Sequence, residues 1–233
     1  MCSSDLEDRQ ITRLLNSVRK SLPGGLKDVT IVLTADHGMP PSPSWLHSVG
    51  VDSGKISEEE AIRLMNERLN ARFGKPEGGS WFAFSADLNF SFSAKALKDK
   101  GVTEEQAEAE AKPVLSGMKG VAHVFGLSDY RARKLPPGMF ERQILKTYVP
   151  GKSGDLIVIP RAFYEVEDDP VNHMTSYAYD RTVPLVIAGA KVRPGVYSTR
   201  ADVIDLAPTL SFLLGILPPS TSEGRVLSEV LAK

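Results

Sequence analysis

Two short apolar runs, VTIVLT at residues 29–34 and VPLVIAG at residues 183–189, constrain the fold of this chain most strongly. Both are rich in β-branched residues without regular polar alternation, which is typical of strands buried on both faces of a parallel sheet. Apolar residues also recur at helical spacing before the first run, namely Ile11, Leu14, Leu15, Val18 and Leu22. They predict an amphipathic helix. The sequence therefore predicts an α/β fold with a central, mostly parallel sheet flanked by helices.

Residues 41–150 differ from the rest of the chain, because charge and turn signals are denser there. Ser57 precedes Glu60 by three residues, the spacing of a capping box at a helix start. The segment WFAFSADLNFSFS alternates around Ala86 and Asp87 and predicts a β-hairpin. We expect this part to form an α+β cap.

The predicted division of the chain follows from these patterns. Residues 1–40 and 151–233 are expected to form the core, and residues 41–150 a cap subdomain inserted between core strands. In this division the apolar run DLIVIP at residues 155–160 belongs to the core sheet with VPLVIAG. Neither half of the predicted hairpin should pair with VTIVLT.

Composition excludes several classes of protein. The 28 basic and 29 acidic residues give a formal net charge of −1, so no overall basic field attracts nucleic acid. The longest apolar runs fall short of the roughly 20 residues that a membrane-spanning helix needs, so no span is predicted. Cys2 is the single cysteine, which excludes an internal disulfide.

Asp36 and His37 are the first candidates for chemistry, because they directly follow a predicted buried strand. Ligands bind at the carboxyl ends of strands in open α/β sheets, and Zn²⁺ accepts both carboxylate and imidazole. The alternative is a capping aspartate beside a surface histidine. His173 lies in a polar loop 136 residues later, where a histidine by itself is usually just solvated. His47 and His123 are assigned no role.

Three segments in order resemble the C-terminal motifs of a known superfamily. They are TADHG at 34–38, NHMTSYAYDRTVPLVIAG at 172–189, and DVIDLAPTLSFLLGI at 202–216 followed by GRVL at 224–227. The chain resembles the alkaline phosphatase superfamily. The nearest branch is the nucleotide pyrophosphatase/phosphodiesterase-like one, including bacterial phosphate-irrepressible alkaline phosphatases.

The resemblance implies a hydrolase of phosphate esters with two zinc ions at the sheet edge. It assigns Asp36 and His37 to the zinc that also holds the nucleophile, and His173 to the zinc that activates the attacking water. It also implies a periplasmic or secreted protein. Met174 stands where the family often has glycine.

Three family elements have no counterpart in these 233 residues. They are an early strand-end aspartate, a Thr or Ser nucleophile, and an aspartate followed by Gly-His. No residue is therefore assigned as catalytic, the zinc site is partial, and the chain alone is expected to be inactive. An N-terminal half that carries these elements is the expected partner.

Other charged residues near the motifs are given structural roles. We expect Asp180 and Arg181 to form an ion pair or a strand cap, and Asp202 and Asp205 to cap helices. Two further readings stay open. One is a non-catalytic remnant or binding protein of the same fold. The other is a sulfatase-like or phosphoglycerate mutase-like member, which the His-x-x-Ser-Tyr-x-Tyr-Asp pattern disfavours.

Overall fold

The computed structural model describes residues 3–135, 139–166 and 171–232 of the chain. Two units can be distinguished, each described below by itself. The first comprises Met1–Asp36 with Val183–Lys233, and the second comprises His37–Thr182. Within the described residues, none of the helices combines the length and the apolar character needed to cross a bilayer.

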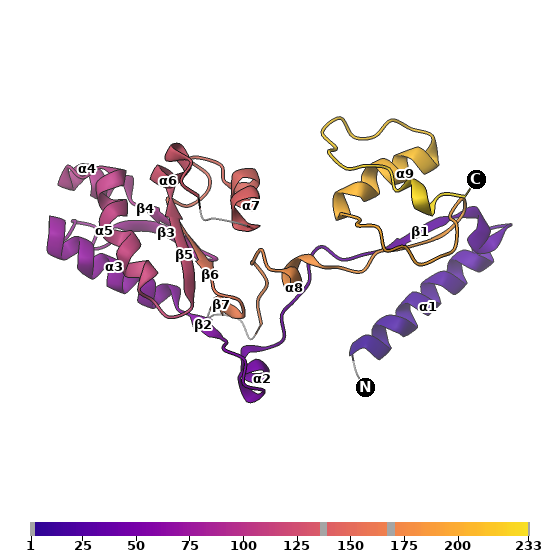
Figure 1. The fold of residues 1–233 in the computed structure, drawn as a ribbon, viewed down its shortest axis with the longest axis horizontal. Coiled ribbons are helices and arrows are strands. Elements are labelled where there is room, and N and C mark those ends of the chain that lie inside the picture. Colours follow the sequence, from indigo (N-terminus) through magenta and orange to yellow (C-terminus); the bar gives the residue numbers. More distant parts are fainter. Residues whose placement is uncertain (1–2, 136–138, 167–170, 233) are drawn as a thin grey trace. The chain divides into compact units, whose positions relative to one another are not determined.

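The first unit is built on a two-stranded antiparallel sheet (Figure 1). Strand β1 (Thr30–Leu33) pairs with β8 (Val186–Gly189), with Thr30 opposite Gly189 and Leu33 opposite Val186. The remaining elements are α1 (Ser3–Ser21), η1 (Gly25–Asp28), η2 (Val203–Asp205), α9 (Leu206–Leu214) and η3 (Ser228–Val230). The predicted first helix is therefore present.

Large apolar side chains of this unit are exposed. On β8, Val186 is 52% exposed, and on α9 Phe212 and Leu214 are 62% and 70% exposed. Leu217 follows at 90%. Strand sequences as apolar as β1 and β8 normally lie inside a larger sheet, and here they form a pair with partly exposed faces.

The second unit is centred on a four-stranded antiparallel sheet of order β3-β4-β6-β5. Its strands are β3 (Phe82–Ala86), β4 (Asn89–Phe92), β5 (Val121–Gly126) and β6 (Leu156–Pro160). A separate parallel pair joins β2 (Gly54–Ile56) to β7 (Tyr164–Val166). The helices are α2 (Pro43–Ser48), α3 (Glu58–Phe73), α4 (Ala94–Lys100), α5 (Glu104–Ser116), α6 (Leu127–Ala132), α7 (Met139–Thr147) and α8 (Ala178–Arg181).

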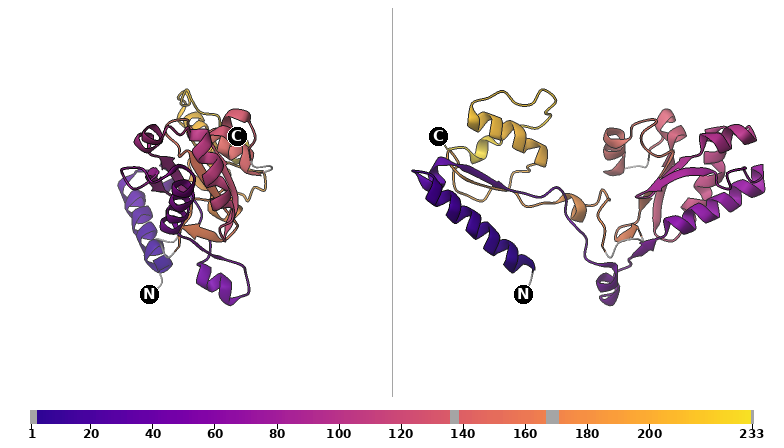
Figure 2. Two further views of the ribbon diagram at one scale, coloured as in Figure 1. Left: turned by 90° about the vertical axis from the view of Figure 1, so that its left-hand side faces the viewer. Right: turned by 180° about the vertical axis from the view of Figure 1, so that it is seen from behind.

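Helices cover both faces of this sheet, with α3 and α5 on one side and α6 and α7 on the other (Figures 1 and 2). Successive strand residues point to opposite faces. Leu156 and Val158 accordingly belong to the core that contains Trp81, whereas Ile157 and Ile159 pack with Phe125. The apolar run of β6 is thus explained by burial on both faces of an antiparallel sheet.

The predicted hairpin and helix start are confirmed. Strands β3 and β4 pair around Asp87 and Leu88, whose φ angles of 52° and 62° suit the tight turns that join antiparallel strands. The Ser57 side chain accepts a hydrogen bond from the backbone N–H of Glu60 and caps α3. As expected, neither hairpin strand pairs with β1.

Two expectations about the core differ from the structure. Among the described residues there is no central parallel sheet, because β1 and β8 pair antiparallel. The run DLIVIP contributes β6, which pairs with β4 and β5 instead of joining β8. The boundaries between the two units lie at residues 36/37 and 182/183, whereas the boundaries predicted from the sequence lie near 40 and 150. An apolar run predicts burial but does not specify the neighbouring strand.

Candidate active site

The segment that follows His37 is fixed by a close backbone contact. The N–H of Gly38 donates to the carbonyl oxygen of Asp180 at 2.7 Å. A Cβ atom at Gly38 would lie 2.0 Å from the carbonyl oxygen of Tyr179, which no side chain tolerates. The glycine after His37 is therefore required by the approach of α8.

His37 and His173 lie against each other although 136 residues separate them in the sequence. Their ring centroids are 3.4 Å apart, and the ring planes differ by 18°. Both side chains are half-buried. The expected convergence of the two histidines is thus found within the second unit.

A hydrogen bond sets the tautomer of His37. Its Nδ1 lies 2.8 Å from the carbonyl oxygen of Gly38. Because a carbonyl oxygen can only accept, Nδ1 carries a proton in this contact, which leaves Nε2 as the nitrogen that a neutral ring would offer to a metal. Metal-binding histidines typically donate their second ring nitrogen in this way, which fixes ring orientation and raises ligand basicity.

Asp180 organises the loop that carries His173. The carboxylate is 5% exposed, and its Oδ2 accepts hydrogen bonds from the N–H of Thr175, at 2.8 Å, and from the Thr175 hydroxyl. Arg181 donates to the carbonyl oxygen of Ser176 at 3.4 Å. Asp180 therefore supports this loop through Thr175, a structural role that differs from the predicted ion pair or strand cap.

Two tyrosines hold the segment that contains α8. The Tyr177 hydroxyl donates to the carbonyl oxygen of Pro160, and the Tyr179 hydroxyl accepts from the N–H of Phe163. Burial raises the pKa of both phenols, so they remain neutral at physiological pH. These contacts attach the segment after His173 to the ends of β6 and β7.

Met174 adopts a backbone conformation that favours glycine. Its φ is 116°, and its side chain is 54% exposed. A bulky residue at positive φ is strained, and the strain is held here by the contacts of the loop on either side. The position after His173 thus has the geometry of the glycine that the family pattern carries there.

Replacing Met174 with glycine is expected to stabilise the second unit by about 1 kcal/mol. Relief of about 1–3 kcal/mol of backbone strain exceeds the roughly 0.5–1 kcal/mol that glycine loses in chain entropy. Urea unfolding measures the difference. Met39→Gly is the matched control, since Met39 is 51% exposed and is not at positive φ. It should lower stability, and equal effects of both variants would contradict the argument.

The third predicted ligand is placed differently. Asp36 belongs to the first unit, and its side chain is exposed. Across the described ranges, no cluster of three or more His, Cys, Asp and Glu side chains is arranged to hold a metal ion. Of the predicted set, the structure brings His37 and His173 together.

The other singled-out residues have structural contacts. His123 lies on the edge strand β5. The buried Asp205 carboxylate accepts from the N–H groups of Asp202 and Arg225, so it joins two backbone segments. It makes no side-chain cap to α9, but its bond to Asp202 caps the 3-10 helix η2, which leads directly into α9, so the expected capping role is found one turn earlier.

Sequence reasoning missed Glu165. This carboxylate is 4% exposed on β7, pairs with Lys55 at 3.2 Å and accepts from the N–H of Asn172 at 3.0 Å. It therefore supports the backbone directly before His173. The sequence gives little sign of this role. Glu165 stands in the run FYEVE, where the alternation of polar and apolar residues predicts that the glutamate faces solvent.

Known proteins match this architecture, although no protein-family model matches the chain. Over 96% of its length it is 27% identical to a calcium-transporting ATPase of Myroides odoratus, and over 97% it is 24% identical to alkaline phosphatase PafA of Elizabethkingia meningoseptica. The crystal structure of wild-type PafA superposes with a TM-score of 0.85 at 23% identity, covering 97% of this chain and 42% of PafA. The resemblance to alkaline phosphatases is confirmed.

The structural match establishes an alkaline phosphatase-like α/β fold. The chain spans 40% of the length of the first two relatives, as expected for a likeness to the C-terminal part of an alkaline phosphatase.

Proposed function

We propose that this chain supplies part of the two-zinc site of a phosphoric ester hydrolase of the alkaline phosphatase or phosphodiesterase type. Asp36 and His37 serve one ion, and His173 serves the other. The observation that carries the proposal is the contact between the His37 and His173 rings, with centroids 3.4 Å apart. These two imidazole rings come from distant loops and lie close enough to bind two metal ions that are about 4 Å apart.

The donor types of this set fit zinc, but their number falls short. Imidazole nitrogen and carboxylate oxygen are normal zinc ligands, and His37 is oriented by its Nδ1 hydrogen bond to Gly38. Catalytic zinc usually has three protein ligands, whereas here two residues serve one ion and one serves the other. When bound, zinc would clamp the reacting oxygens of a phosphoryl transfer and lower the pKa of its water.

The nucleophile is assigned to a part of the fold that these residues do not span. No Ser or Thr occupies the corresponding motif, and a covalent phosphoryl transfer needs a hydroxyl nucleophile. The exposed apolar side chains of the first unit, including Val186, Phe212, Leu214 and Leu217, support a packing surface for that part. By resemblance, the complete enzyme acts in the periplasm or outside the cell.

The chain as written is expected to bind zinc weakly and to show no turnover above background. Purified protein with excess Zn²⁺ is assayed with p-nitrophenyl phosphate and bis-p-nitrophenyl phosphate, and zinc binding is measured by calorimetry. His173→Ala should weaken zinc binding by about tenfold or more, because it removes a direct ligand. His47→Ala is the control and should leave binding unchanged.

A second experiment tests whether sequence encoded upstream supplies the nucleophile. The chain is expressed together with any in-frame sequence encoded upstream of Met1. If that sequence contains a strand followed by a Thr or Ser nucleophile, zinc-dependent turnover should appear and should be lost in Asp36→Ala. Turnover of the 233-residue chain alone would contradict the proposal. Unrelated upstream sequence, together with unaltered zinc binding in His173→Ala, would favour the non-catalytic remnant.

A further inference from the structure

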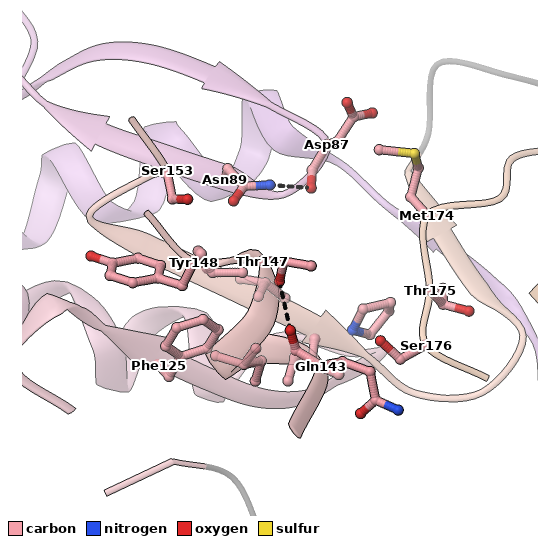
Figure 3. Close-up of a pocket in the computed structure, with 15 residues that line it drawn as sticks. Asp87, Asn89, Phe125, Gln143, Thr147, Tyr148, Ser153, Met174, Thr175 and Ser176 are labelled. Atoms are coloured by element: carbon pink, nitrogen blue, oxygen red, sulfur yellow. Dashed lines mark hydrogen bonds between the residues drawn. The ribbon is translucent and has the colours of Figure 1, made fainter. Parts of the chain in front are cut away.

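A second feature of the His37–Thr182 unit lies beside the histidine pair. A cavity of about 360 Å³ opens between the sheet, α7 and the loop that follows His173. In Figure 3, Met174, Thr175 and Ser176 lie on one side of it, and Phe125 and Tyr148 lie on the opposite side. The cavity is at the small end of the roughly 300–1,000 Å³ range of ligand sites.

The floor of this cavity is apolar and rigid. Phe125 and Tyr148 are 1% and 5% exposed, and their rings meet edge to face with centroids 5.8 Å apart. Ile157 and Ile159 of β6 line it beside them. Because both rings are anchored in the core, the floor is preformed and favours flat apolar groups.

The rim is polar but nearly uncharged. Asn89, Thr147, Ser153 and Ser176 provide amide and hydroxyl groups. Among the described lining residues the sole charged side chain is Asp87, and none is a lysine or arginine. The described part of the lining therefore offers hydrogen bonds to a neutral molecule and no compensation for a second negative charge.

Tyr148 adds a neutral hydroxyl. Burial raises the pKa of its phenol to about 12, so it stays protonated over the working range of a phosphatase. It cannot serve as an anionic partner for a cationic ligand.

The cavity shares part of its wall with a second space that lies beside His173. A much smaller space is lined by His173 together with Asp87, Val158, Pro160, Met174 and Thr175. The last five of these residues also line the larger cavity. Met174 and Thr175 line both spaces, so the larger cavity lies next to the loop that carries His173.

We propose that this cavity holds the leaving group of the substrate ester, and that it selects an uncharged aromatic alcohol of one or two rings. The assignment rests on the proposed phosphoric ester hydrolysis. The aromatic floor disfavours polyols such as sugars, and the absence of a cation in the described lining disfavours leaving groups that carry another phosphate.

The test measures binding of the alcohol itself, without metal and without turnover. The probe is 4-methylumbelliferone at a pH where it is neutral, followed by its fluorescence anisotropy with the full chain. Thr147→Trp should fill the cavity and weaken binding by about tenfold or more. Leu145→Trp is the matched control, because Leu145 is on the same helix, is 48% exposed and does not line the cavity. It should change binding by less than about twofold.

Thr147→Phe is a smaller replacement for the case in which tryptophan prevents folding, which circular dichroism detects. Saturable binding that both filling variants weaken and the control retains supports the proposal. It is overturned if the probe does not bind saturably, if Leu145→Trp weakens binding equally, or if glucose competes as well as the probe. Zinc binding of Thr147→Trp should match that of the wild type. The experiment therefore distinguishes failure of the proposed zinc site from failure of the proposed binding site for an aromatic alcohol.

Discussion

Gly38→Ala should lower the free energy of unfolding of the His37–Thr182 unit by about 3 kcal/mol or more. The added Cβ would lie 2.0 Å from the carbonyl oxygen of Tyr179 and 3.0 Å from that of Thr182. Both are backbone atoms, so rotation of a side chain cannot relieve the clash. Overpacking costs about 1–3 kcal/mol, and loss of the 2.7 Å hydrogen bond from Gly38 to Asp180 adds about 1–3 kcal/mol.

Gly78→Ala is the matched control for this variant. A Cβ at Gly78 meets no atom within 4 Å, and this glycine is not at positive φ. The control should unfold within about 0.5 kcal/mol of the wild type. Thermal or urea unfolding measures both, with an expected drop of about 6 °C or more for Gly38→Ala. Equal stability of the two variants would show that α8 does not approach Gly38 as described.

Local features of this chain could be predicted from the sequence because each depends on a few neighbouring residues. The Ser57 cap requires only a hydroxyl three residues before an N–H, and the hairpin requires alternation on either side of a turn. The placement of His173 beside His37 was different, since loops 136 residues apart have no local signal for contact. It followed from the ordered motifs of the resemblance.

The sequence did not predict strand pairing in the same way. DLIVIP and VPLVIAG are both short apolar runs, yet β6 is buried on both faces between helices and β8 is largely exposed. The apolar character of β8 fits a larger sheet, such as a more complete alkaline phosphatase-like fold would provide. The buried carboxylates of Asp180 and Glu165 were also unassigned as loop supports, because burial of an acid depends on donors that the sequence does not pair with it.

Asp180→Ala should have its largest effect on zinc binding, which we expect to weaken by about 10- to 100-fold, the usual cost of removing a group that positions a ligand. The carboxylate accepts from both the N–H and the hydroxyl of Thr175, two residues after His173. Without it, a buried N–H loses its acceptor, which also lowers stability by about 2 kcal/mol. Calorimetric zinc titration and urea unfolding of the same preparations measure the two effects.

Asp180→Asn separates hydrogen bonding from charge. Its amide oxygen can replace Oδ2 as the acceptor for Thr175, and its NH₂ group takes the place of Oδ1, which is buried without a hydrogen-bond partner among the described residues. A buried charge with an unsatisfied oxygen is costly, so the neutral amide should retain most of the stability and of the zinc affinity. If Asp180→Asn loses as much zinc affinity as Asp180→Ala, the carboxylate acts through its charge. If neither variant alters zinc binding, Asp180 does not position His173 as a ligand.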